Sequence, residues 1–456
     1  MKIKTKIGEG TIAKLANKEY IKLLLLHFGI GFGIYLFPPL AKITLHVTLL
    51  YLVFWVIDNR NRNNEALMAA AYISGAEVFF RMTGGVIFYE TGKYMVIVFL
   101  FIGLIFKGSS VKTVPFWIYL LILVPGIVVA SLNVPPGVDF RQAIAFNLSG
   151  PVCLGVSAVY CYYKKITRLQ FEKVLVMMLL PLIANMIYLY FYTPSLGTAL
   201  NMNANYAASG GYGPNQIATV MGLGSFLLVT RLFVVKHSMI NLIDLILLIL
   251  MTYRALGTFS RGGVITGAVC AVAFIAVLYY KQSSKGREKL RLKFVVMACS
   301  LLITWSIVSI KTSGLIGNRY AGKDAAGQLK DDITTGRVDL VITELEGFYF
   351  NPVVGVGVGQ ATYYRREAAG IITATHNEVS RLLSEHGMLG ILAIVILIFV
   401  PILFWLKFEN NYYFLAFMAF WFLTINHSAM RVALPAFVYG LALLYIVDEK
   451  KNPVYR

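Results

Sequence analysis

Charged residues are scarce in this chain, and their scarcity excludes a soluble globular protein. Only 14% of the 456 residues are Asp, Glu, Lys or Arg, whereas 58% are hydrophobic and the mean hydropathy is +0.70. A soluble protein of this length could not cover its surface with so few polar side chains. Apolar runs recur that can cross a bilayer of roughly 30 Å at about 1.5 Å per helical residue. Composition therefore predicts an all-α, polytopic membrane protein, because a β-barrel would show short alternating segments instead.

Cysteine is also scarce, and its placement argues against a disulfide framework or a cysteine metal site. The four cysteines, Cys153, Cys161, Cys270 and Cys299, fall in apolar runs without metal-type spacing, so we interpret them as thiols of the protein core. The sequence has no Asp-x-Asp motif and no cluster of histidines with carboxylates. It therefore predicts neither a metal site nor any other cofactor.

The apolar runs predict about 12 to 14 transmembrane helices. We expect N-terminal transmembrane helices over 1–311, one long loop with short amphipathic helices over 312–386, and C-terminal transmembrane helices over 387–456. The candidate spans are residues 22–38, 42–57, 65–82, 92–106, 114–131, 142–163, 171–192, 214–230, 238–253, 262–280, 292–310, 387–406, 411–425 and 432–447.

The formal net charge of +19 is explained by membrane topology and not by nucleic-acid binding. Basic residues gather in alternate connections, such as the one that holds Arg60 and Arg62 and the run KQSSKGREKLRLK at 281–293, which we expect near anionic lipid. Because Lys and Arg collect on the cytoplasmic side, this pattern predicts cytoplasmic termini and an extracytoplasmic loop 312–386. The lysine-rich N-terminus precedes no small-residue cleavage site, so we interpret it as the start of an anchor helix.

The loop 312–386 shows local order of its own. In TGRVDLVITELEGF (Thr335–Phe348) apolar residues recur at helical spacing, which predicts an amphipathic helix with Arg337 in its first turn. The alternating glycines of NPVVGVGVGQ (351–360) lack the strand–helix context of a nucleotide-binding loop and predict a tight turn instead. Another outside loop, 193–216, is rich in Gly, Asn and Tyr and could line a cleft for a sugar or a lipid headgroup.

The stretch TATHNEVSRLLSEHGMLG predicts a short polar helix that Gly387 closes. Thr375 and Glu378 have the spacing of a capping box, which makes Thr375 the expected N-cap and His376 the first helical residue. The positive end of the helix dipole disfavours an imidazolium at that position. A histidine kept neutral in this way could serve as a general base. The alternative is a surface histidine near a helix cap.

Arginines lie at the outer ends of predicted spans. TYRALGTFSRGG (252–263) places Arg254 and Arg261 in a short outside connection, where Ser260 and the two glycines would let a backbone N–H approach an anion. A charge at membrane depth costs roughly a few kcal/mol, so it is usually paired or lines a wet cavity. The planar guanidinium group suits phosphate oxygens, although an arginine here could instead extend to the membrane interface.

Two further polar pairs lie within or beside predicted spans. Glu77 and Arg81 have the i, i+4 spacing of an intramembrane ion pair, and His427 and Arg431 lie at an outer boundary. Together with the loop residues they suggest a lipid diphosphate held by outward-facing arginines, with a neutral histidine that deprotonates an acceptor hydroxyl. The guanidinium groups would then neutralise charge where soluble glycosyltransferases use a metal.

Five segments resemble the bacterial O-antigen ligase and polymerase superfamily. They are GPNQIA (213–218), GTFSRGG (257–263), GRVDL (336–340), NPVVGVGVGQ (351–360) and THNEVSRLLSEHGMLG (375–390). The resemblance implies that Arg261, Arg337 and His376 are the catalytic residues.

The resemblance also implies an activity and a location. It implies a metal-independent, inverting O-antigen ligase of the bacterial inner membrane, which works on the periplasmic side. Such an enzyme transfers a glycan from undecaprenyl diphosphate to a sugar hydroxyl of lipid A–core. We expect a monomer among membrane lipids, with no nucleic acid as partner. The expected substrate-binding residues are Asn215, Arg254, Ser260, Asn377 and Arg381.

Two related activities and one unrelated activity stay open as alternatives. An O-antigen polymerase would use another lipid-linked repeat unit as acceptor, and a protein O-oligosaccharyltransferase would use a Ser or Thr hydroxyl. A transporter of lipid-linked glycans belongs to a different class. Against a transporter, the sequence shows no inverted repeat, and its polar residues gather on one side of the membrane and not at the midplane.

Overall fold

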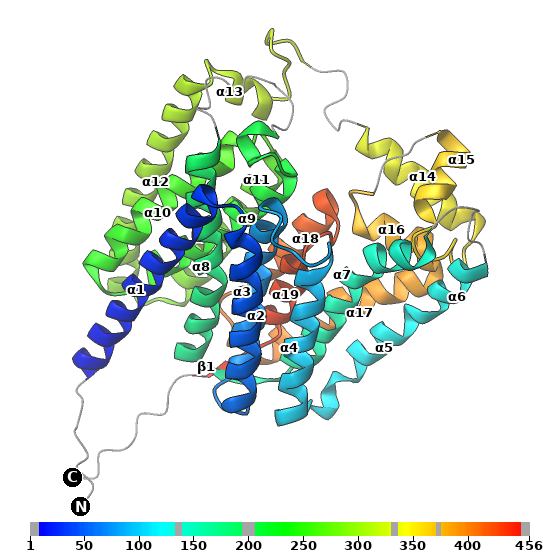
Figure 1. Ribbon diagram of the computed structural model, residues 1–456, viewed down its shortest axis with the longest axis horizontal. Helices are drawn as coiled ribbons and strands as arrows, with labels where there is room; N and C mark the ends of the chain where they lie inside the picture. The colour runs from blue at the N-terminus through cyan, green and yellow to red at the C-terminus, as the bar shows by residue number, and fades with distance from the viewer. Residues whose placement is uncertain (1–8, 133–138, 194–205, 330–335, 371–374, 448–456) are drawn as a thin grey trace, which may run out of the picture.

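The computed structural model describes residues 9–132, 139–193, 206–329, 336–370 and 375–447, and nearly all of them are helical (Figure 1). The elements up to residue 192 are α1 (Glu9–Leu36), α2 (Leu40–Asp58), α3 (Glu65–Met82), α4 (Thr91–Lys107), η1 (Val111–Thr113), α5 (Val114–Ile122), α6 (Val124–Leu132), α7 (Phe140–Cys161), β1 (Lys165–Thr167) and α8 (Arg168–Tyr192). The later elements are η2 (Ala207–Ser209), α9 (Pro214–Val234), α10 (Ser238–Gly257), α11 (Arg261–Lys281), α12 (Ser284–Lys311), α13 (Leu315–Tyr320), α14 (Arg337–Phe350), α15 (Ala361–Ala369), α16 (Glu378–His386), α17 (Met388–Phe408), α18 (Phe414–Ser428), α19 (Ala433–Ala442) and β2 (Tyr445–Val447).

The all-α class and the polytopic membrane architecture are confirmed. Among the described residues, 10 helices are long and apolar enough to cross a membrane, and α18 and α19 are shorter apolar helices. α3 carries the charges Glu65, Glu77 and Arg81 and is nonetheless buried along almost its whole length. It is therefore an internal helix of the bundle, shielded from lipid by its neighbours.

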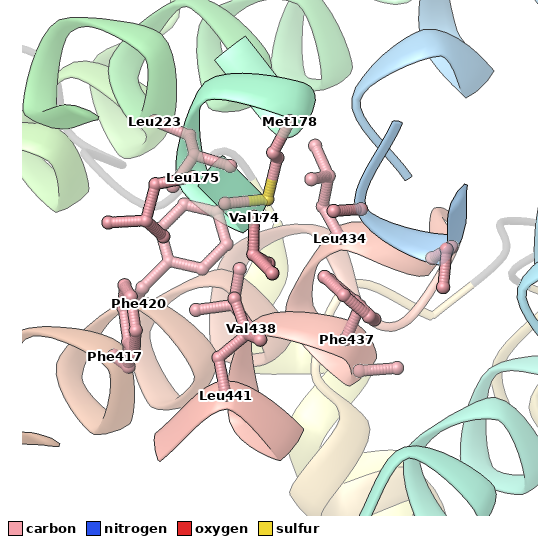
Figure 2. Packing of buried hydrophobic residues seen from close by; sticks show 14 of the residues in the cluster. Val174, Leu175, Met178, Leu223, Phe417, Phe420, Leu434, Phe437, Val438 and Leu441 are labelled. Carbon is pink, nitrogen blue, oxygen red and sulfur yellow. The ribbon is translucent and has the colours of Figure 1, made fainter. Parts of the chain in front are cut away.

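The centre of the bundle is formed by α3, α8, α9 and α19. In the most apolar window of α9, 83% of residues are buried, whereas the same measure is 17% for the peripheral helix α12. Figure 2 shows side chains of α8, α9, α18 and α19 that pack together, among them Met178, Leu223, Phe417 and Val438. Lipid tails are as apolar as these side chains, so the side chains gain no hydrophobic free energy when they leave lipid for the protein core. Close van der Waals packing therefore holds the helices together.

Glycine lets α9 and α11 approach closely at the end that will matter for the site. A Cβ atom at Gly263 would lie 2.2 Å from the Ala218 carbonyl carbon, and one at Gly222 would lie 2.1 Å from the Gly263 carbonyl oxygen. No side chain fits in these spaces, so the backbones of the two helices are in direct contact. This contact holds the first turn of α11 beside the first turn of α9.

Two expectations, one about the last span and one about Cys299, are wrong in detail. The last predicted span, 432–447, is helical only over Ala433–Ala442, after which β2 pairs in parallel with β1 in a two-stranded sheet. Cys299 is exposed on α12, whereas Cys153, Cys161 and Cys270 are buried as expected. Apolar runs look alike in sequence whether they face lipid or protein, which is why Cys299 was assigned to the core.

The long loop folds into short helices at two places (Figure 1). α13 follows α12 directly, and α14, α15 and α16 lie together beside α6 and α17. The predicted amphipathic helix is confirmed as α14, although it begins at Arg337 and ends at Phe350, and Thr335 is outside the described residues. α14 packs on α16, and α16 in turn packs on α17 and α18 of the bundle.

Candidate active site

A cavity of about 620 Å³ lies where the bundle meets the helices of the long loop. Its walls come from the first turns of α9, α11 and α14, from α13, from the segment before α16 and from the end of α18. The lining residues are Asn215, Ser260, Arg261, Gly262, Arg319, Arg337, Val338, Leu340, Val341, Ile342, Glu344, Thr375, His376, Asn377, Asn426 and His427. Of the predicted site residues, the structure brings together Asn215, Ser260, Arg261, Arg337, His376 and Asn377.

The first turn of α11 presents Arg261 to the cavity. Ser260 is the N-cap residue, and its hydroxyl donates a hydrogen bond of 2.7 Å to the Asn215 side-chain oxygen on α9. A Cβ atom at Gly262 would lie 2.5 Å from the His427 ring, so the glycine makes room for that ring. The Ser-Arg-Gly-Gly sequence thus anchors the arginine between α9 and α18.

Arg319 of α13 is a cavity residue that sequence reasoning missed. Its Nε donates a 3.1 Å hydrogen bond to the carbonyl oxygen of Phe259, one residue before the N-cap of α11. Phe259 adopts a positive φ of 56°, which turns its carbonyl toward the arginine's segment. No motif marked Arg319, because only the folding of α13 back onto α11 brings it to the cavity.

Three arginines, Arg261, Arg319 and Arg337, therefore share one cavity. Burial lowers the pKa of Arg319, and the positive charges of Arg261 and Arg337 lower it further. Burial likewise lowers the pKa of Arg337, with added repulsion from Arg261 and Arg431. The lowered pKa values mean that burial and the neighbouring arginines disfavour the charged form of each guanidinium group. A bound anion would offset this cost and would therefore be attracted to the cavity.

Glu344 is the carboxylate that lines the cavity, and other groups already engage it. It accepts hydrogen bonds from Arg365 on α15 and from the Ser380 hydroxyl on α16. Burial raises the pKa of Glu344, while these hydrogen bonds and the positive charges of Arg365 and Arg381 act in the opposite direction. Its charge is thus balanced by Arg365, and the excess positive charge of the cavity remains.

His376 lies just before α16 and not at its first residue. The N-cap is Asn377, whose side-chain oxygen accepts hydrogen bonds from the backbone N–H of Val379 at 2.9 Å and Ser380 at 3.2 Å. The Thr375 hydroxyl instead binds the backbone of Asn377. The predicted capping box is therefore wrong, because Asn caps a helix at least as well as Thr and stands two residues closer.

His376 is neutral at physiological pH, as expected, but for a different main reason. The pKa of His376 is lowered to about 4. Burial is the largest cause, and the positive charges of Arg431 and Arg337 also lower it. A backbone hydrogen bond with His427 works in the opposite direction. Its Nδ1 is buried and has no hydrogen-bond partner within the part of the chain that the structure describes. An uncharged imidazole thus faces a cationic cavity.

The arginines and the histidine lie within one stretch that matches a known family. Residues 246–395 match the family model described as O-antigen ligase. Over this stretch the chain is similar to the O-antigen ligase and polymerase superfamily. The match covers four of the five segments on which the expected resemblance rests, and GPNQIA (213–218) lies before it. No curated protein matches the chain.

Two cavity walls lie outside the matched residues. Asn215 is on α9, and Asn426 and His427 are on α18. The His427 ring lies 3.3 Å from the Thr219 hydroxyl through Nε2 and 2.8 Å from the Leu423 carbonyl through Nδ1. The sequence places His427 at the outer boundary of a span, and the packing of α18 on α9 and α11 brings its ring to the cavity.

Two predicted substrate-binding arginines, Arg254 and Arg381, do not line the cavity. Arg254 is buried on α10, where it donates a 2.5 Å hydrogen bond to the Thr193 hydroxyl and lies 4.2 Å over the Tyr190 ring. Arg381 is buried on α16 in ion pairs with Glu378 and Glu385. Both guanidinium groups are engaged in packing, so we no longer assign them to substrate. Their sequence neighbourhood resembled a site, but their side chains point into the protein.

The glycine-rich segment 351–360 is a turn, as predicted, and it holds the C-terminal end of α16. The N–H of Val356 donates to the Ser384 carbonyl at 2.8 Å, and the N–H of Gly359 donates to the Glu385 carboxylate at 2.9 Å. Gly357 has a φ of 97°, and a Cβ atom there would lie 2.6 Å from the Ala130 nitrogen of α6. The turn therefore fixes α16 and with it the segment of His376.

Proposed function

We propose that this membrane enzyme is an O-antigen ligase, a glycosyltransferase whose donor is a glycan on undecaprenyl diphosphate. The observation that carries the proposal is the gathering of Arg261, Arg319 and Arg337 around a neutral His376 in one cavity. A diphosphate has the negative charge and the paired oxygens that a planar guanidinium group can bind through two N–H groups. The superfamily match supports a lipid-linked substrate.

In the proposed reaction, His376 is the general base. Its neutral imidazole takes the proton of an acceptor sugar hydroxyl while the hydroxyl oxygen forms a bond to the anomeric carbon of the donor. The bond from that carbon to the diphosphate oxygen breaks, and undecaprenyl diphosphate leaves with the electron pair. Attack from the side opposite the leaving group inverts the anomeric configuration.

The arginines act on the leaving group. Negative charge develops on the bridging oxygen as the bond breaks, and guanidinium groups already fixed in the cavity stabilise this charge without reorganisation. Arg261 and Arg337 are the expected diphosphate ligands, and Arg319 adds a third. Because the arginines supply this neutralisation, we propose that transfer is metal-independent.

Holding both substrates in one membrane lowers the entropic barrier to their meeting. We propose lipid A–core as acceptor, with the cavity on the periplasmic side of the bacterial inner membrane and both termini in the cytoplasm. The asymmetry of basic residues supports this orientation. We further propose that Asn215, Ser260 and Asn377, which line the cavity, hydrogen-bond substrate.

A transfer assay in nanodiscs tests the proposal. Purified protein receives undecaprenyl-diphosphate glycan and lipid A–core in the presence of EDTA, as wild type, His376→Ala and the control His46→Ala. His46 is an exposed histidine on α2, remote in sequence from every cavity residue. We expect glycosylated lipid A from the wild type and the control only.

Each other outcome changes one part of the proposal. Elongation of the donor without a lipid A product would show a polymerase, and transfer to an added acceptor peptide would show a protein O-oligosaccharyltransferase. Full activity of His376→Ala would remove the base. Activity that EDTA abolishes and a divalent cation restores would refute the metal-independent step.

A further inference from the structure

The central helix α3 carries an ion pair that the cavity does not explain. Glu77 and Arg81 are bonded at 2.5 Å, and their side chains are 0% and 1% exposed. Burying such a pair costs solvation, which the attraction between the charges often fails to offset, so it is weak evidence for a gain in stability. α3 also lies outside the residues that match the ligase family.

Each partner makes a second bond to the segment 429–433, which links α18 to α19. The other carboxylate oxygen of Glu77 accepts a 2.5 Å hydrogen bond from the N–H of Ala433. Nη1 of Arg81 donates a 2.9 Å hydrogen bond to the carbonyl oxygen of Arg431. The ion pair thus binds the link between α18 and α19 at two points, the Arg431 carbonyl and the N–H of Ala433, the first residue of α19.

The same segment binds the residues around His376. The N–H of Ala429 donates to the His376 carbonyl at 3.1 Å, and the N–H of Met430 donates to the Glu378 carboxylate at 3.3 Å. Nη2 of Arg431 donates to the Thr375 carbonyl at 2.7 Å. Residues 429–431 therefore bind the backbone carbonyls of Thr375 and His376 and the side chain of Glu378, the first residue of α16.

We propose that Glu77 and Arg81 are positioning residues, which hold the base His376 in place through the segment 429–433. This inference rests on the proposed function, since it takes His376 as the base. His376 itself lies in a short non-helical stretch, so its position depends on such hydrogen bonds to a rigid element. α3 supplies that element from the centre of the bundle. Displacement of a reacting group by about 1 Å can cost about 100-fold in rate.

The groups that face His376 directly are a different set. They are Arg337 from α14, His427 from the end of α18 and Arg431 from the link between α18 and α19, with Arg261, Arg319 and Glu344 on the other cavity walls. Glu77 and Arg81 act one step further away, through the backbone that they bind. Their removal should therefore change the placement of the base and leave the diphosphate ligands intact.

The test compares Glu77→Gln, Arg81→Lys and Arg81→Met with wild type, each also in a His376→Ala background. The matched controls are Glu172→Gln and Arg168→Met, which break an i, i+4 pair on α8 that is half exposed. We expect kcat to fall about 10- to 100-fold in Glu77→Gln, with the KM for donor changed less than about twofold. Arg81→Lys should retain more activity than Arg81→Met. In the His376→Ala background, Glu77→Gln should lower the residual rate no further, because the base is already gone.

Hydrogen exchange provides a readout that does not depend on turnover. We expect faster exchange of the Val379 and Ser380 amides in Glu77→Gln than in Glu172→Gln, because α16 loses the anchor of its first turn. Unchanged exchange there would overturn the positioning role even if no transfer were detected. An equal fold-loss from Glu77→Gln in both backgrounds would also overturn it, since the effect would not pass through His376. Inactivity of the wild type, or full activity of His376→Ala, would instead count against the proposed function.

Discussion

Repulsion among arginines governs the chemistry of the cavity at the scale of single residues. Arg261, Arg319 and Arg337 gather around a volume of about 620 Å³, and the lining carboxylate Glu344 is bound to Arg365. Burial is the main cause of the lowered pKa of Arg319 and Arg337, and the repulsion between the arginines lowers it further. A diphosphate would offset both effects. The free enzyme is thus prepared for an anion.

Arg319 provides the sharpest residue-scale prediction because no motif marked it. We expect Arg319→Ala to lower kcat/KM for the lipid diphosphate donor about 100-fold, or about 2.7 kcal/mol of transition-state stabilisation. The control is Arg366→Ala, which removes an exposed cation from α15. Steady-state transfer rates at fixed salt measure both. Equal, small effects in the two variants would mean that Arg319 only supports the fold.

The pH profile tests the state of His376. Because burial and Arg431 lower the pKa of the free histidine to about 4, the base is deprotonated above that pH. We expect kcat/KM, which reports the free enzyme, to decline only as pH falls through about 4. A bound diphosphate adds negative charge and raises the pKa, so the acid limb of kcat should lie at higher pH. Acid limbs of both parameters near pH 6.5 would contradict this account.

At the scale of elements, α16 is held at both ends. Asn377 caps its first turn, and the turn 351–360 binds the backbone and the carboxylate of its last residues. The interior is equally constrained, since Arg381 pairs with Glu378 and Glu385 below the surface. α16 is therefore a rigid support for the histidine that precedes it.

Two glycines allow a matched test of the turn that holds α16. Gly357 and Gly327 both have a positive φ, 97° and 84°, but only Gly357 faces backbone atoms within 4 Å. We expect Gly357→Ala to lower the free energy of unfolding by about 1–3 kcal/mol and to reduce kcat. Gly327→Ala carries only the cost of its backbone angle, about 1 kcal/mol. Thermal unfolding in detergent compares them, and an equal shift in both would show that the turn yields easily.

At the scale of the whole molecule, the internal helix α3 is connected through hydrogen bonds to the segment that contains His376. α3 is surrounded by α4, α8, α9 and α19, and its ion pair reaches the link between α18 and α19. The cavity walls come from both sides of the long loop, from α9 to α18. The site therefore depends on the assembled bundle and not on the loop alone.

Membrane orientation is predicted from the basic run 281–293, and α12 offers a direct test. Its 28 residues span about 42 Å, more than the hydrocarbon core, so its two ends lie on opposite sides of the membrane. We expect a cysteine at Gln328 to react with an impermeant thiol reagent from the periplasm. A cysteine at Ser284 should react only after the inner membrane is permeabilised.

Both cysteine substitutions belong in a Cys299→Ser background, because Cys299 is exposed on the same helix. Both positions are exposed in the structure, so access is limited by the membrane alone. Reaction at Ser284 in intact cells would reverse the predicted orientation.

Local patterns in the sequence determined the elements. Each predicted apolar span overlaps a helix, because apolar runs and helical periodicity are properties of neighbouring residues. The motifs also placed Arg261 in a short outside connection and Arg337 and His376 in the long loop, and the cavity unites them. The resemblance to the ligase superfamily came from the same short stretches and was confirmed.

Only the tertiary structure decided which polar side chains meet. It brought Arg319 and His427 into the cavity and turned Arg254 and Arg381 away from it. It also joined Glu77 to Ala433 across the bundle. Such contacts depend on helix crossings and on the burial of each side chain, which neighbouring residues do not encode. The sequence alone thus determined the class and the main reactive groups, whereas packing determined the geometry in which they could act.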